Sequence, residues 1–163
     1  MPEWVLHFDG LYEPRYSDRG IATYGWQARH GDEVVAEDKG LVMGPGEGAS
    51  ANVAEFGALL HGLQWLAANK RDACPLVVRG DNKLAIETVA GRWNLSSARL
   101  LPLRDMARDL VARLGDVRLE KVGREENAEA DRLSREAYHE AAAAHPEWGL
   151  GVHARSRRRT AQP

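Results

Sequence analysis

The sequence predicts an α/β fold in which helices flank one mixed five-stranded sheet. Two observations carry this prediction. Three strand-like segments come first, separated by loop and turn residues, so they are expected to pair as antiparallel neighbours. Helix-like segments then alternate with two more strand-like segments, and helical connections of this kind join parallel strands. The expected order is therefore three strands, a helix, a strand, two helices, a strand and a helix.

Three apolar runs mark the N-terminal strands, at residues 4–8, 21–29 and 34–42. The first run ends at Asp9 and Gly10, and a long loop follows. Residues 30–33 read His-Gly-Asp-Glu and predict a tight connection between the second and third strands. These two strands should therefore form a hairpin.

The first helix is predicted by apolar residues at helical spacing; Ser50 and Asn52 are alternative N-caps, and the helix should end near Asn69. The later elements are a buried strand at residues 75–79, helices at 83–90 and 100–114, a half-exposed strand at 116–122 and a last helix from about 126 to 146. The strand at 75–79 leads directly to Gly80 and Asp81. It therefore repeats the arrangement seen at the end of the first strand.

A chain of 163 residues with 44% hydrophobic and 28% charged residues is typical of one globular domain. We expect the domain at residues 1–146 and a basic, flexible tail at 147–163. Cys74 is alone, is expected to be buried just before a strand, and has no sequence neighbours that resemble a zinc cluster. A reducing, cytoplasmic location fits best. No segment resembles a signal peptide or membrane span, so we expect no membrane association.

The net charge of −2 does not by itself indicate a nucleic-acid-binding protein. Charge is unevenly distributed, however, because residues 83–113 hold six basic and three acidic side chains. This segment is therefore locally cationic and can approach phosphates.

Four carboxylates stand where a strand ends or where a helix should face the sheet. They are Asp9, Glu55, Asp81 and Asp131. If the first and fourth strands are adjacent, the two aspartates that end them meet at one edge, where both helices can add a carboxylate. Crowded like charges repel, so an ionised cluster needs cations, and ligands that are all oxygen favour Mg²⁺ or Mn²⁺ over zinc. Two such ions suit phosphodiester hydrolysis. Chance placement is the competing explanation, because the chain has 24 acidic residues.

Four segments around these carboxylates, taken in order, resemble the motifs of type 1 ribonuclease H. They are residues 8–10, 52–55, 80–83 and 127–131. The resemblance covers roughly residues 3–140 and is closest to compact members that lack an extra basic protrusion between the middle helices. It implies the ribonuclease H-like fold, two Mg²⁺ ions with Mn²⁺ as a substitute, and the four carboxylates as catalytic metal ligands. It also implies cleavage of the RNA strand of an RNA/DNA hybrid, leaving 5′-phosphate and 3′-hydroxyl ends. Separately, we expect a monomer, because no obligatory protein partner is evident from the sequence.

The resemblance further implies a set of substrate contacts, each of which has a simpler structural alternative. The expected substrate-binding residues are Gly10, Ser50, Asn52, Asn82, Lys83, Trp93, Arg124 and Asn127. Asn52 and Asn127 can instead cap helices, Lys83 can be merely solvated, and Trp93 can belong to the core. Arg124 can instead pair with Glu125 or Glu126.

Two departures from the family pattern concern the surroundings of the carboxylates. The loop at residues 11–20 is bulkier and more charged than the usual short turn, and Arg15 and Arg19 can meet phosphate there. The loop before the last helix lacks the histidine found in many relatives. Arg124 stands in that loop and can hold phosphate charge, but it cannot shuttle a proton at neutral pH. His7 and His61 are expected to be packed side chains and not ligands.

Two other functions remain open at this level. The chain can be another nuclease of the same broad fold, such as a 3′–5′ exonuclease, or a non-catalytic module that binds hybrids. A requirement for a free RNA end would indicate the first, and binding without cleavage in manganese would indicate the second.

Overall fold

The computed structural model describes residues 2–14 and 20–150. Its centre is a five-stranded sheet in the order β3-β2-β1-β4-β5, in which β1, β2 and β3 are antiparallel and β1, β4 and β5 are parallel. The strands are β1 (Trp4–Tyr12), β2 (Ala22–His30), β3 (Glu33–Met43), β4 (Leu76–Gly80) and β5 (Val117–Lys121). The α-helices are α1 (Ala51–Asn69), α2 (Lys83–Val89), α3 (Leu101–Leu114) and α4 (Ala128–Ala144), and two short 3₁₀ helices are η1 (Arg124–Asn127) and η2 (Pro146–Trp148).

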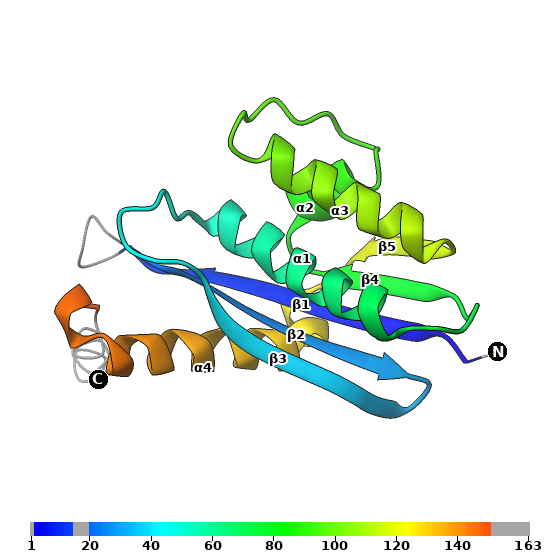
Figure 1. The fold of residues 1–163 in the computed structure, drawn as a ribbon, viewed down its shortest axis with the longest axis horizontal. Coiled ribbons are helices and arrows are strands. Elements are labelled where there is room, and N and C mark those ends of the chain that lie inside the picture. The colour runs from blue at the N-terminus through cyan, green and yellow to red at the C-terminus, as the bar shows by residue number, and fades with distance from the viewer. Residues whose placement is uncertain (1, 15–19, 151–163) are drawn as a thin grey trace.

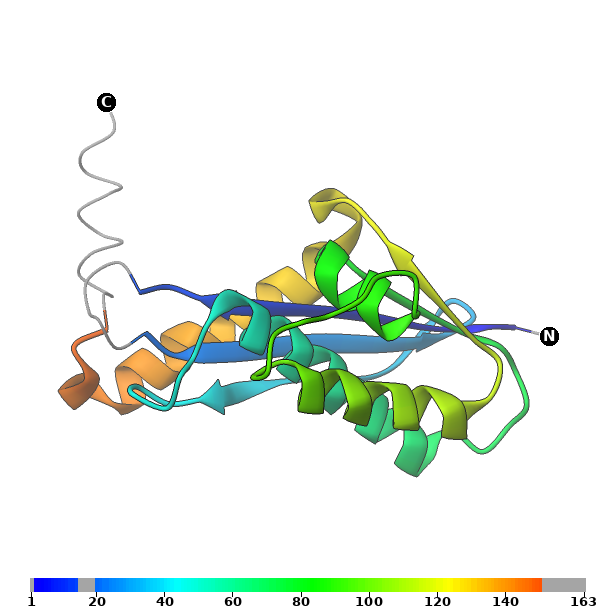
Figure 2. The same cartoon turned by 90° about the horizontal axis from the view of Figure 1, so that it is seen from above.

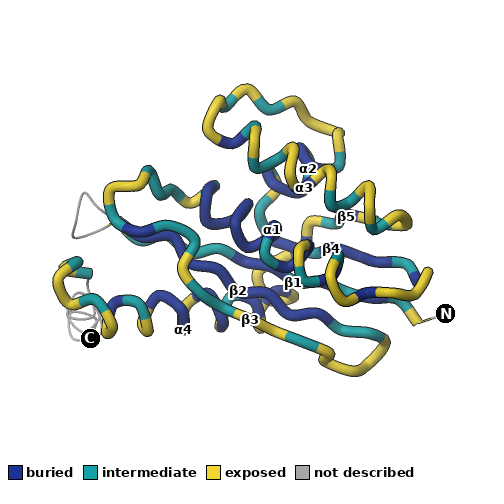
Figure 3. The backbone as a smooth tube through the Cα atoms, viewed as in Figure 1, coloured by how far each residue is buried: buried dark blue, intermediate teal, exposed yellow. Residues whose placement is uncertain are grey.

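The helices divide between the two faces of the sheet. Helices α1, α2 and α3 lie on one face, and α4 crosses the other face below β1, β2 and β3 (Figures 1 and 2). Alternate residues of a strand point to opposite faces, so Leu6 and Phe8 of β1 meet the buried side of α1 at Phe56 and Leu63. This main core lies between α1 and the sheet, where Figure 3 shows the buried stretches of backbone.

Two glycines let the helices approach the sheet closely. A Cβ atom on Gly10 of β1 would collide with the α1 backbone at Ala54 and Glu55. On the other face, a Cβ on Gly25 of β2 would lie only 2.5 Å from the backbone nitrogen of Ser134 on α4. Gly25 is the antiparallel partner of Asp9. Both helices therefore press on the sheet next to the same short stretch of β1.

The predicted fold is confirmed, including the adjacency of the first and fourth strands. Two boundaries near the carboxylates differ from expectation. Strand β1 continues past Gly10 to Tyr12, because β2 supplies partners that far, and α4 begins at Ala128 after a 3₁₀ turn instead of near residue 126. Of the two proposed N-caps of α1, Ser50 is the one used.

Further predictions concern Cys74, the stretch between α2 and α3, and membrane spans. Cys74 is buried and precedes β4, as predicted. The stretch between α2 and α3 contains no added helix, as expected of the compact form. No helix in the described part of the chain is long and apolar enough to cross a membrane. Arg15, Arg19 and the tail beyond residue 150 lie outside the described residues.

A candidate metal centre at the end of strands β1 and β4

Asp9 and Asp81 meet because β4 is shorter than β1. Parallel pairing between the two strands ends at His7 and Arg79, and β4 itself stops at Gly80, against the ring of Phe8. The chain then turns, and Asp81 stands beside the continuing β1 strand that carries Asp9. Ligand sites at the carboxyl ends of parallel strands are common, because the edge there is open.

Glu55 reaches the same place from α1. The helix starts at Ser50, whose hydroxyl accepts a hydrogen bond of 3.1 Å from the backbone nitrogen of Val53. Glu55 lies one turn into the helix, where the absence of a side chain on Gly10 lets α1 press against β1. The amide of Gly10 donates a hydrogen bond to the Glu55 carboxylate. One carboxylate oxygen from each of Asp9, Glu55 and Asp81 lies within 4.8 Å of the others.

Asp131 comes from the opposite face of the sheet. It lies in the first turn of α4 and is close enough to Asp9 to act on it by charge and by a hydrogen bond. Its carboxylate is also paired with Arg135, one helical turn later, at 3.0 Å. Asp131 therefore lies beside Asp9 but outside the group of ligand atoms that Asp9, Glu55 and Asp81 bring within 4.8 Å, and its charge is partly neutralised by Arg135.

The start of α4 is tied to β1 by Asn127. Its side-chain nitrogen donates a 2.8 Å hydrogen bond to the carbonyl of Phe8, the residue before Asp9. The Asn127 side chain makes no cap bond to α4, so the expected capping role is not the one it has. Because Asn127 is only 1% exposed, its position favours holding Asp9 in place over the direct substrate contact expected from sequence.

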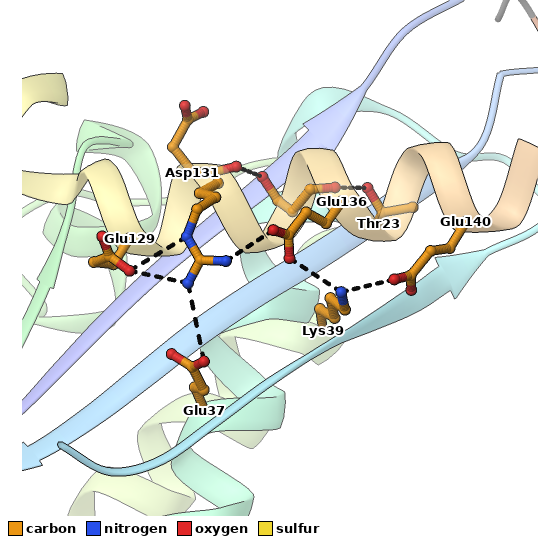
Figure 4. A network of polar contacts seen from close by, with 9 residues as sticks. Thr23, Glu37, Lys39, Glu129, Asp131, Glu136 and Glu140 are labelled. Carbon is orange, nitrogen blue, oxygen red and sulfur yellow. Dashed lines mark hydrogen bonds and ion pairs between the residues drawn. The ribbon is translucent and has the colours of Figure 1, made fainter.

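A salt-bridged network holds the rest of α4 against the sheet (Figure 4). Lys39 of β3 contacts Glu136 at 3.0 Å and Glu140 at 2.7 Å, and Arg132 links Glu129 to Glu136 along the helix. Beneath these exposed pairs, the buried hydroxyl of Thr23 donates a 2.9 Å hydrogen bond to the carbonyl of Ser134. In Figure 4 the carboxylate of Asp131 points away from this network.

Two of the carboxylates, Asp9 and Glu55, have raised pKa values. Burial raises the pKa of Asp9 to about 8, and the nearby charge of Asp81 adds to the rise. Burial also raises the pKa of Glu55 well above its usual range, with the Asp9 charge as the next cause. One oxygen of Glu55 is buried and has no hydrogen-bond partner in the described part of the chain. A bound cation would remove both the repulsion and the unpaired oxygen.

The ligand set fits a hard divalent cation. It offers carboxylate oxygens from three elements, and His7 and His61, the histidines closest to them in sequence, are engaged elsewhere. His61 is stacked on Tyr24 with a 3.9 Å separation of ring centroids, and His7 lines a separate pocket with Arg29 and Arg79. Oxygen-only ligands select Mg²⁺ or Mn²⁺ over zinc.

A cleft of about 370 Å³ opens beside the carboxylates. It is lined by Glu55, Asp81, Asn82, Lys121, Val122, Gly123 and Arg124. Neither Lys121 nor Arg124 has an ion-pair partner within residues 2–14 and 20–150, so the expected alternative pairing of Arg124 with Glu125 or Glu126 is absent from that part of the chain. The cleft thus places two free cations next to the acidic cluster. Lys121 is not among the residues predicted from the sequence, in which its only signal is its place at the end of a half-exposed strand.

Two asparagines sit at the mouth of the site. The side chains of Asn52 and Asn82 approach each other at 3.5 Å. Asn82 caps α2 through a 2.8 Å bond from the Ala85 nitrogen, whereas Asn52 caps nothing because Ser50 does. Asn52 is therefore available for a ligand. Ser50 was expected either to cap α1 or to bind substrate, and in the structure it caps α1.

Lys83 and Trp93 form a second small group beyond α2. The Lys83 ammonium lies 5.3 Å from the ring centroid of Trp93, a cation–π distance. Trp93 is 44% exposed, so it is not the core residue that its type alone would suggest. Its position leaves the indole free to contact a ligand.

Comparison with known proteins identifies the family. The model of the family described as "Reverse transcriptase-like" matches residues 15–137. The bifunctional protein Rv2228c of Mycobacterium tuberculosis is 36% identical over 138 residues, which are 85% of this chain and 36% of that protein. The chain thus spans about a third of the length of the curated relatives it matches.

Solved structures agree with this assignment. RNase H1 from the halophilic archaeon Halobacterium salinarum NRC-1 has a TM-score of 0.74 and 29% identity, covering 85% of this chain and 98% of that one. The N-terminal RNase H domain of Rv2228c has a TM-score of 0.72 and 30% identity, covering 83% and 98%. LC11-RNase H1, solved with an RNA/DNA hybrid, has a TM-score of 0.74 over 85% and 98% of the two chains, but its 21% identity supports the fold alone. This chain therefore belongs to the reverse transcriptase-like family and has the ribonuclease H-like fold of the type 1 ribonucleases H.

Proposed function

We propose that this protein is an endonuclease that hydrolyses the RNA strand of RNA/DNA hybrids and leaves 5′-phosphate and 3′-hydroxyl ends. The observation that carries the proposal is the convergence of Asp9, Glu55 and Asp81, with Asp131 beside them, in a chain of this family. A relative of the same fold was solved with an RNA/DNA hybrid, which supports the substrate class.

The four carboxylates would hold two Mg²⁺ ions, or Mn²⁺ in their place. When bound, such a pair supplies an activated water and charge stabilisation for the leaving oxygen. The chain itself provides position and charge. Gly10 and Asn127 fix Asp9 and Glu55 against each other, and Arg135 limits the charge that Asp131 adds. Lys121 and Arg124, free in the cleft, would hold the phosphate whose charge rises during the reaction.

Residues at the entrance of the cleft would recognise the RNA/DNA hybrid. Asn52 and Asn82 offer donors and acceptors that suit a 2′-hydroxyl in a minor groove. Trp93 would meet the DNA strand by packing on a sugar or base, and Lys83 would make a polar contact to the RNA backbone. Ser50 can add a DNA phosphate contact only if its hydroxyl keeps the helix cap at the same time.

A duplex with an internal RNA tract and blocked ends tests the proposal. The protein should cut inside the tract with Mg²⁺, and mass spectrometry of the products should find the proposed ends. Asp9→Asn and Asp81→Asn should each lower the rate at least about 100-fold, because a carboxamide lacks the charge that holds the cations. Asp32→Asn, at the exposed β2–β3 turn, is the matched control and should keep full activity. Full activity of either cluster variant would refute the assignment.

The same assay separates the two remaining functions. A 3′–5′ exonuclease would leave the blocked duplex intact and digest it only when an RNA end is free. A non-catalytic hybrid-binding module would retain the duplex in a gel without cutting it, even in manganese.

A further inference from the structure

A second group of metal-ligating side chains lies at the other end of the sheet. One ligand atom from each of His30, Asp72 and Cys74 lies within 4.8 Å of the others. His30 ends β2, and the other two residues belong to the loop between α1 and β4. Trp4 is the cross-strand partner of His30 and lies five residues before Asp9, so this group is about 17 Å from the carboxylate cluster along β1.

The side chains of this group are held in place by Trp4. Its indole nitrogen donates a 3.0 Å hydrogen bond to one oxygen of Asp72, and its ring stacks on His30 at 4.4 Å with an 8° angle between the planes. The backbone nitrogen of Cys74 binds the other oxygen of Asp72 at 3.0 Å. The side chains of His30 and Asp72 are thus already oriented. Contacts of this kind commonly orient the ligands of a metal ion.

The imidazole of His30 is half-buried, and one of its two nitrogens has no partner in the described residues. Its Nε2 atom is buried and has no hydrogen-bond partner in the described residues. A buried polar atom without a partner is unusual, and an ion is one of the reasons for it. The Cys74 thiol, 8% exposed, stands within reach as a soft ligand.

We propose that His30, Asp72 and Cys74 form a zinc site, with a water molecule as the fourth ligand. A thiolate, an imidazole and a carboxylate suit Zn²⁺ and disfavour Mg²⁺. Bond lengths near 2.0–2.3 Å place the ligand atoms of one zinc ion roughly 3–4 Å apart, so zinc binding would draw together atoms that now lie within 4.8 Å of one another. The thiol proton leaves to solvent as the sulfur–zinc bond forms, so affinity rises with pH.

Lys70 is the feature that weakens this site. Its ammonium lies 3.2 Å from an oxygen of Asp72, and its side chain is 3% exposed. The positive charge competes with a metal ion for the same carboxylate. Lys70→Met keeps the buried length of the side chain and removes the charge, so it should tighten zinc binding. Unchanged or weaker binding in this variant would contradict the role of Asp72 as a ligand.

Cobalt(II) reports directly on the proposed ligands. Added to the full chain, Co²⁺ should produce the charge-transfer absorption of a cobalt–thiolate bond, and one equivalent of Zn²⁺ should remove it. Asp9→Asn, which disrupts only the carboxylate cluster, should leave the signal unchanged. Cys74→Ser should abolish it, and His30→Gln should weaken affinity at least about 100-fold, since even loss of a ligand's supporting contact costs about 10–100-fold.

Three results would overturn the proposal. They are no absorption in the unaltered chain, an affinity that His30→Gln leaves unchanged, and a signal lost in Asp9→Asn. Because substitutions of a buried cysteine can disturb folding, zinc protection of Cys74 from alkylation is measured in the unaltered chain as well. Zinc should slow that alkylation, and an unaltered rate at saturating zinc would count against the site.

Discussion

Gly10 is the residue on which the approach of α1 to β1 depends. Any side chain there would enter the backbone of α1 at Ala54 and Glu55. The same glycine donates its amide to the Glu55 carboxylate. Its expected role as a substrate contact remains a prediction, but the structure gives it a prior role in building the site.

Gly10→Ala should therefore destabilise the fold. We expect a loss of about 1–3 kcal/mol in the free energy of unfolding, the usual range for overpacking, and a loss of activity because Glu55 is displaced. Urea denaturation and the cleavage assay measure the two effects. Gly123→Ala is the control for stability, because nothing lies within 4 Å of a Cβ at that position. Equal stability of both variants would contradict the packing argument.

The raised pKa of Asp9 should make the stability of the folded chain depend on pH. Between its ordinary value of 3.8 and about 8, the folded metal-free chain binds more protons than the unfolded chain. The stability that the protonated carboxyl contributes is therefore lost as pH rises through this window. Asp9→Asn cannot titrate, so it should match the unaltered chain near pH 4 and be more stable at pH 8.

Thermal or urea unfolding in the presence of a chelator measures this difference. At pH 8 we expect the free energy of unfolding of Asp9→Asn to exceed that of the unaltered chain by at least about 1.4 kcal/mol, the equivalent of one pKa unit. Magnesium should reduce the gap, because only the unaltered chain gains from binding it. A gap that is the same at both pH values would show that Asp9 is not the titrating group.

At the scale of an element, helix α4 shows what positions Asp131, a side chain that we propose to be catalytic. Its outer surface is held to β3 by exposed ion pairs, and its inner surface by the Thr23 hydroxyl and by close packing at Gly25 (Figure 4). Exposed pairs contribute little because solvent screens them and the side chains lose freedom. The buried contacts should therefore set the register that brings Asp131 to Asp9.

Thr23→Val and Lys39→Met test this ranking. Thr23→Val keeps the shape of the side chain and removes one buried hydrogen bond, so we expect a loss of about 1 kcal/mol and reduced cleavage. Lys39→Met breaks two exposed pairs and should cost less, within about 0.5 kcal/mol. Chemical denaturation of the two variants in parallel gives the comparison. The reverse order would mean that the salt-bridged network, and not the sheet contact, holds α4.

For the whole molecule, the net charge of −2 conceals a local arrangement of cations around the acidic site. Lys121 and Arg124 line the cleft, and Lys83 stands over Trp93. Binding of a hybrid should therefore depend on salt through a small number of phosphate contacts, and not through a general basic surface.

Lys121→Gln should make that salt dependence shallower. Each lost phosphate contact reduces the slope of log affinity against log salt by about 0.9. Measuring binding in the Asp9→Asn background prevents cleavage from interfering. Arg118→Gln is the matched control, because Arg118 is on the same strand, faces the opposite side of the sheet and is paired with Glu120 at 3.4 Å. An equal change in the slope of log affinity against log salt in both variants would show that Lys121 does not contact a phosphate of the substrate.

The sequence was sufficient to predict the sheet order and the proximity of three carboxylates, since Asp9 and Asp81 end strands and Glu55 lies one turn after a recognisable cap. It could not give features that depend on pairs distant in the chain. In the sequence Asn127 resembles a helix cap, but in the structure its side chain donates a hydrogen bond to the carbonyl of Phe8. His30 comes near Cys74 only because strand pairing places it beside Trp4.

Trp93 also gives this protein a built-in optical reporter. The chain has five tryptophans, and the other four are buried or half-buried. Iodide in solution should therefore quench the emission of Trp93 first, and that red-shifted component should move to shorter wavelength when a bound strand covers the indole. Binding at the surface around Trp93 can thus be followed without any label, by light that the protein itself emits.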